Sequence, residues 1–189
     1  MTFARLFRSP FVRVPFIGFA VVATVATSAP QWDLEARAVD EGVTLAPGDS
    51  FERKVEYDAS HDVQLETSVT GPAASGTRIR VEHDDSNGDS AADAGDRIHV
   101  GSGACDARFT YESKEPGRWV FVRTDGTLDE IAYTAAESKS SCNSKSGVAT
   151  VKVTNDGAES LKLHVVVRAT IGGRDDEPDG AFVNAKVVQ

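Results

Sequence analysis

The sequence predicts an all-β protein, an antiparallel β-sandwich of jelly-roll or immunoglobulin-like type with about nine strands. Three observations favour this fold. Apolar and polar residues alternate with a period of two in many short segments, turn residues separate these segments, and no segment shows the period of an amphipathic helix. A closed β-barrel is the alternative, because alternation alone does not distinguish the two architectures.

The clearest alternation lies in residues 161–171. One face of this segment carries six apolar side chains: Leu161, Leu163, Val165, Val167, Ala169 and Ile171. Residues 147–154 also alternate, and the polar residues 155–160 between the two segments favour a tight turn. We therefore expect residues 147–171 to form a β-hairpin.

The remaining strands are expected where alternation recurs, at residues 42–45, 50–57, 63–69, 77–81, 97–100, 107–113, 118–124 and 181–188. Residues 128–135 are compatible with a strand or a short helix, and the Ser- and Lys-rich residues 137–147 are expected to form a loop. The apolar run from Trp119 to Val122 indicates a strand that is covered on both faces, with Trp119 in the core.

Two segments, PGRWVFVRTDG and GVATVKVTNDGAESLKLHVVV, resemble segments of many exported bacterial β-sandwich modules, including pre-peptidase C-terminal-type domains. The resemblance covers only these two stretches. It consists of alternation and turn residues, so it implies a fold class and defines no family.

Residues 1–29 have the features of a secretory signal peptide. Arginines precede a thirteen-residue apolar run over residues 14–26, which is shorter than the roughly 20 residues of a membrane-spanning helix. Cleavage is expected between residues 28 and 38, and an uncleaved anchor is the alternative. Residues 30–40 would then be a linker and residues 41–189 a single β-sandwich domain. The expected location is extracellular or in the cell envelope, with no membrane span after cleavage.

The chain is acidic, with 20 basic and 29 acidic residues and a net charge of −9. Residues 1–38 contain four arginines and two acidic residues, so the remainder carries a net charge of −11. Nucleic acids and anionic lipids would be repelled by such a protein, and neither is expected as a partner.

Two cysteines are present, Cys105 and Cys142. An exported chain with two cysteines is expected to form one disulfide bond. The bond would close a loop of 37 residues. In the chain-entropy model such a closure stabilises the fold by roughly 3–4 kcal/mol. Two free thiols are the alternative.

The acidic segment 84–96 is the clearest candidate metal site. Counted from Asp85, its oxygen-bearing side chains stand at positions 1, 3, 5, 9 and 12, which are Asp85, Asn87, Asp89, Asp93 and Asp96. This spacing is similar to that of an EF-hand loop, and Ca²⁺ is the ion it would hold. However, Ser90 stands where that loop needs glycine, and no helices flank it. A solvated acidic loop is therefore the alternative, as it is for the acidic residues 175–179.

His83 and His99 flank this acidic segment. Together with nearby carboxylates they define an alternative function, a small secreted hydrolase or metalloenzyme, while exposed histidines at strand ends are the simpler interpretation. The sequence contains no nucleophile motif of the G-x-S-x-G type, and we assign no catalytic residue.

The expected function is that of a secreted, non-enzymatic β-sandwich module with a binding, adhesion or cell-envelope role, with Ca²⁺ as a candidate stabilising ion. Its partner would be an extracellular ligand or protein whose identity the sequence does not specify. A monomer or weak oligomer is expected, and edge pairing through residues 181–188 is a route to assembly.

Overall fold

The computed structural model describes residues 32–84, 91–92, 99–100, 105–173 and 178–189. These residues contain strands and no helix, so none of the described segments is a helix that could cross a membrane. The strands are β1 (Trp32–Leu45), β2 (Ser50–Ala59), β3 (Gln64–Thr70), β4 (Arg78–Asp84), β5 (Ala91–Ala92), β6 (His99–Val100), β7 (Ala107–Glu115), β8 (Arg118–Val122), β9 (Leu128–Tyr133), β10 (Ala136–Ser141), β11 (Ser146–Asn155), β12 (Leu161–Gly173) and β13 (Val183–Val188).

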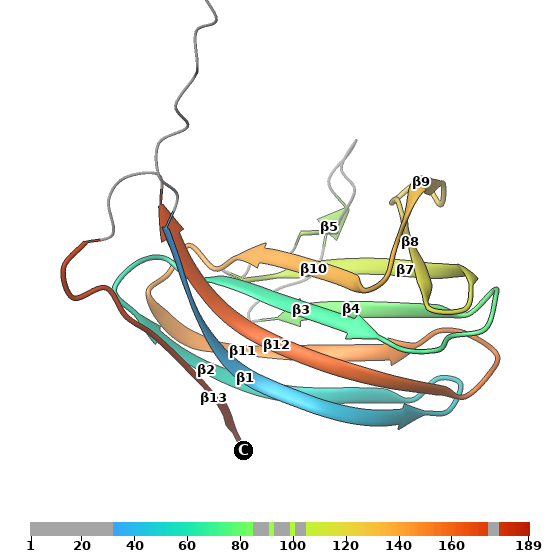
Figure 1. Ribbon diagram of the computed structural model, residues 1–189, viewed down its shortest axis with the longest axis horizontal. Coiled ribbons are helices and arrows are strands. Elements are labelled where there is room, and N and C mark those ends of the chain that lie inside the picture. The colour runs from blue at the N-terminus through green and yellow to red at the C-terminus, as the bar shows by residue number, and fades with distance from the viewer. Residues whose placement is uncertain (1–31, 85–90, 93–98, 101–104, 174–177) are drawn as a thin grey trace, which may run out of the picture.

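The strands form two antiparallel sheets that pack face to face (Figure 1). The first sheet has the order β1-β12-β3-β10. The second sheet has the order β13-β2-β11-β4-β7. Along different parts of its length, β7 also pairs with β6 and with β8. The predicted β-sandwich is therefore confirmed. The closed-barrel alternative is wrong, because the described strands form two separate sheets that do not close into one barrel.

The strand pairs are nested along the chain. β4 pairs with β7, β3 with β10, β2 with β11 and β1 with β12, so each pair encloses the previous one. The chain passes from one sheet to the other between β1 and β2, between β2 and β3, and between β3 and β4. This arrangement is the jelly-roll form of the predicted sandwich.

The expected hairpin over residues 147–171 is wrong in its pairing, although both of its strands exist. β11 lies in the second sheet between β2 and β4, whereas β12 lies in the first sheet between β1 and β3. The buried Asn155 holds the connection. Its side chain donates to the carbonyls of Leu45 and Glu159, and it accepts from the Gly157 backbone N–H. The polar turn residues therefore carry the chain across the sandwich.

Residues 32–40, expected to be a linker, instead form the first part of β1. A β-bulge between Arg37 and Val39 explains the error. Before the bulge, even-numbered residues such as Leu34 point inward, and after it odd-numbered residues such as Val43 do so. Because a bulge reverses the alternation, no single period of two runs through the strand.

The expected loop over residues 137–147 is also partly wrong, because its first half belongs to β10. The inward positions of β10 after Ala136 are Ser138 and Ser140, both buried. Alternation of apolar residues is therefore absent from this strand, although it has a buried face and an exposed face.

The hydrophobic core lies between the two sheets and follows the alternation of the strands. Every second residue of β12 is buried, from Leu161 to Ile171, as predicted. Trp119 is fully buried in this core, and the other residues from Val120 to Val122 are buried as well. The predicted covering of β8 on both faces is confirmed.

Candidate functional site

The predicted calcium ligands cannot be placed in the fold. Asp85, Asn87, Asp89, Asp93 and Asp96 all lie outside the described residues. The acidic residues 175–177 lie outside them too. Within the part of the chain that the structure describes, no group of three His, Cys, Asp or Glu side chains is placed to hold a metal ion. Calcium binding thus stays a prediction.

His83 is a core residue and not an exposed histidine at a strand end. Its side chain is only 2 % exposed and lies between the two sheets. Nε2 lies 2.8 Å from the Thr67 hydroxyl of β3, and Nδ1 lies 2.7 Å from the Ser140 hydroxyl of β10. Burial lowers the pKa of His83 to about 4, so the imidazole is neutral at physiological pH.

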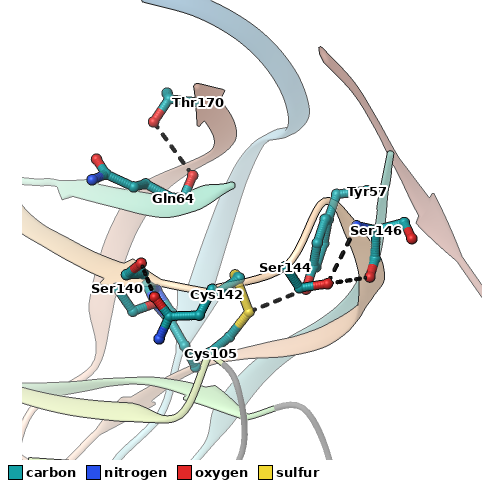
Figure 2. The surroundings of a disulfide bond; sticks show 11 residues. Tyr57, Gln64, Cys105, Ser140, Cys142, Ser144, Ser146 and Thr170 are labelled. Atoms are coloured by element: carbon teal, nitrogen blue, oxygen red, sulfur yellow. Dashed lines mark hydrogen bonds between the residues drawn. A yellow bond between two sulfur atoms is a disulfide. The ribbon is translucent and has the colours of Figure 1, made fainter. Parts of the chain in front are cut away.

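The disulfide between Cys105 and Cys142 is present, as predicted. Cys105 precedes β7 of the second sheet and Cys142 follows β10 of the first, so the bond joins the two sheets at one end of the sandwich (Figure 2). The Tyr57 hydroxyl lies 3.4 Å from the Cys105 sulfur, and the Cys142 backbone N–H donates to the Val63 carbonyl. Both cysteines are fully buried, which fits a structural bond.

The two sheets meet along one side of the sandwich. There β1 of the first sheet packs beside β13 of the second. Arg53 of β2 spans the two sheets and donates two hydrogen bonds to the Glu41 carboxylate of β1, at 3.0 and 2.6 Å. The guanidinium holds the pKa of Glu41 below its ordinary value, and the same pair raises the pKa of Arg53.

The opposite side of the sandwich contains a concave site between β7, β8, β9 and β10, which we call the aromatic hollow. Figure 1 shows β8 and β9 turning away from the sheets beside β10. The hollow has a volume of about 340 Å³ and is lined by Phe109, Tyr111, Phe121, Asp129, Tyr133, Glu137 and Lys139. This volume is at the lower end of the roughly 300–1,000 Å³ of small-molecule sites.

The aromatic floor of the hollow is held by a ring–ring contact and by hydrogen bonds. The Tyr111 and Phe121 rings meet edge to face with centroids 5.4 Å apart. The Tyr111 hydroxyl donates to the Glu137 carbonyl at 2.6 Å and lies 3.1 Å from the Ser138 hydroxyl. Burial raises the pKa of Tyr111 to about 12, so this phenol stays a donor.

The accessible wall of the hollow comes from β9. Tyr133 is 42 % exposed, whereas Phe109, Tyr111 and Phe121 are largely buried. The sequence predicted a strand or a short helix at residues 128–135 and did not indicate a site at Tyr133. The fold places Tyr133 in one hollow with residues of β7, β8 and β10, and no local sequence pattern reveals this proximity.

The charged side chains around the hollow are mostly paired. Arg123 donates from Nε to Asp129 Oδ1 at 2.7 Å, and Lys139 forms an ion pair with Glu66. Glu137 is exposed at the rim. The hollow therefore offers acceptors and a donor around apolar rings without a large net charge.

A second hollow, of about 310 Å³, lies on the outer face of the second sheet where β4 ends. Charges alternate across four neighbouring strands there, from Glu52 through Lys152 and Glu82 to Arg108. Glu82 accepts hydrogen bonds from Arg108 at 2.7 Å and from Arg80 at 3.2 Å. Such a ladder of mutually compensating charges is typical of a solvated sheet face.

Comparison with known proteins gives no relative from which a role could be transferred. No protein-family model matches the sequence, and no curated protein matches it significantly. The aromatic hollow is thus the candidate functional site on its own geometry.

Proposed function

We propose that the protein is an exported, non-enzymatic β-sandwich module that binds an extracellular ligand in the aromatic hollow. The observation that carries this proposal is the aromatic lining of the hollow, in which an exposed tyrosine lies beside three buried aromatic rings. The β1–β13 side also has a hollow, of about 500 Å³, but its lining is mostly charged or polar and contains no exposed aromatic ring. Concave, mostly apolar sites with a few polar groups are the usual form of ligand sites.

A binding screen tests this proposal. The purified protein is screened by ligand-observed NMR against a library of saccharides, quaternary amines and aromatic acids. Tyr133→Ala should abolish binding of the hits. Ile131→Ala should leave it unchanged, because Ile131 lies on the same strand, is 64 % exposed and does not line the hollow. Hits that bind both variants equally, or a library without hits, would contradict the proposal.

Export is the second part of the proposal, and it is supported by the leader-like residues 1–29 and by the disulfide. The fold also bears on the cleavage site. Cleavage after Ala38 would remove residues 32–38 of β1, most of which pair with β12. We therefore expect cleavage after Ser28 or Ala29. N-terminal sequencing of the protein from a secreting host checks this, and a first residue after Ala38 would contradict it.

Calcium binding by residues 85–96 is a further part of the proposal, and its support is the spacing of the oxygen ligands alone. Calorimetric titration of the purified protein with Ca²⁺ should give heat that Asp85→Ala and Asp89→Ala each reduce. The control is Asp58→Ala, which removes an exposed carboxylate from β2. No heat in the wild type, or equal heat in all variants, would reject the site.

For the alternative, a hydrolase or metalloenzyme using His83 and His99, the described residues offer no supporting observation. His83 uses both ring nitrogens in contacts within the core, and the structure describes only the backbone of His99. We therefore retain the binding module as the proposed function.

A further inference from the structure

We infer that the ligand of the aromatic hollow is a neutral saccharide of one or two sugar rings. The inference rests on the proposed function, because it names the chemical class that the same site would bind. Three properties of the hollow lead to it: an accessible aromatic ring, hydrogen-bonding groups of both kinds, and nearly balanced charge.

The accessible ring is that of Tyr133, with Phe121 and Phe109 contributing to the apolar lining. One face of a pyranose ring consists of C–H groups. These groups pack favourably on the electron-rich face of an aromatic side chain. Tyr133 therefore provides the surface on which the apolar face of a sugar would lie.

The polar groups that line the hollow can form hydrogen bonds with the hydroxyl groups of a sugar. Glu137 presents an exposed carboxylate acceptor and Lys139 an ammonium donor, and the largely buried Asp129 carboxylate also lines the hollow. A hydroxyl both donates and accepts hydrogen bonds, so a ring bearing several hydroxyls can use acceptors and donors that lie around one hollow. A purely aromatic or aliphatic ligand would form no hydrogen bonds with these polar groups.

The charge pairing disfavours a charged ligand. Asp129 is already held by Arg123, and Lys139 is already paired with Glu66. A quaternary ammonium ligand is normally held by several aromatic faces, but Tyr133 is the one exposed ring among the four aromatic residues that line this hollow. An anionic ligand would have to compete with Glu66 for Lys139. An uncharged ligand requires neither pair to break.

An extended peptide is also disfavoured. β10 is the edge strand of the first sheet, and an added strand would need its outward-facing backbone groups. However, the Glu137 carbonyl already accepts the hydrogen bond of the Tyr111 hydroxyl, at 2.6 Å. The Tyr111 hydroxyl, which belongs to the floor of the hollow, therefore occupies part of the edge that a peptide would pair with.

Isothermal titration calorimetry with defined probes tests the inference. The probes are uncharged methyl hexosides and their disaccharides, with glucuronic acid, glucosamine and choline as charged counterparts. We expect at least one neutral saccharide to bind about tenfold more tightly than every charged probe. Tyr133→Ala should weaken that binding by about tenfold or more, whereas Tyr133→Phe should retain most of it because the ring remains. Ile131→Ala should match the wild type.

The outcomes separate the inference from the proposed function. If choline or a charged sugar binds most tightly and Tyr133→Ala abolishes that binding, the saccharide class is wrong and the hollow remains the site. If a saccharide binds but Tyr133→Ala has no effect in a variant with unchanged melting temperature, both the inference and the assignment of the hollow are wrong. If no probe of the panel binds, the saccharide inference is overturned, while the screen of the wider library still tests the hollow.

Discussion

At the scale of single residues, His83 shows how the core of this sandwich uses polar groups. A buried imidazole normally costs stability unless its nitrogens are hydrogen-bonded. Here the hydroxyls of Thr67 and Ser140, from the first sheet, form hydrogen bonds with the two ring nitrogens of His83, from the second sheet. The three residues form a polar bridge between the sheets, next to the edge-to-face contact of His83 with Phe109.

This bridge makes stability depend on pH. The pKa of His83 is about 4 in the folded protein and about 6.5 when unfolded, so between these values the unfolded chain binds more protons. The contribution of neutral His83 is complete above pH 6.5 and is lost as the pH falls toward 4, by up to about 3 kcal/mol. Urea unfolding at pH 7, 5 and 4 measures the loss.

The control for this prediction is a pair of histidine variants. His83→Gln should flatten the dependence between pH 6.5 and 4, whereas His164→Gln should keep most of it, because His164 is exposed on β12. An identical pH dependence in wild type and His83→Gln would show that the buried imidazole is not the titrating group.

At the scale of elements, β10 presents the clearest difference between sequence pattern and structure. Its sequence, AESKSS, reads as a loop, yet alternate residues face the core and meet partners from β4 and β7. We expect Ser140→Ala to destabilise the protein by about 1–3 kcal/mol, because it removes a buried hydrogen-bond partner of His83.

The neighbouring Ser141 is the matched control for that change. It points outward from the same strand and is exposed, so Ser141→Ala should change stability by less than about 0.5 kcal/mol. Chemical denaturation of both variants at pH 7 compares them. Equal losses, or a larger loss for Ser141→Ala, would contradict the register of β10.

The elements also show what the sequence could and could not predict. Residues 161–171 and 118–122 were recognised because their inward positions are apolar. β10 was missed because its inward positions are serines, and the start of β1 was missed because the bulge before Val39 reverses the alternation.

The predicted pairing of β11 was wrong because local alternation defines a strand but not the sheet to which the strand belongs. The aromatic hollow was missed for the same reason, since its walls come from four strands.

At the scale of the whole molecule, the disulfide and the nested strand pairs have complementary roles. The nested pairs bring sequence-distant strands together, and the bond between Cys105 and Cys142 fastens β7 to β10 near one end of the core. Replacing both cysteines with alanine should lower the free energy of unfolding by roughly 3–4 kcal/mol.

Denaturant unfolding of the double variant, at equal protein concentration and without reductant, measures this loss. The fold itself should persist, with an unchanged far-ultraviolet circular dichroism spectrum, because the strand pairs and most of the buried core remain in the variant. Stability equal to that of the wild type would show that the disulfide adds nothing to the packing of the two sheets.

At the scale of the whole molecule, the proposed ligand site lies in the aromatic hollow between β7 and β10 and not on the β1–β13 side. Chemical-shift mapping with the isotopically labelled protein and the tightest-binding compound of the library tests this placement. We predict shifts concentrated at Tyr111, Phe121 and Tyr133, with none at Glu41 or Arg53. Shifts centred on the β1–β13 side, with the hollow unperturbed, would contradict this placement.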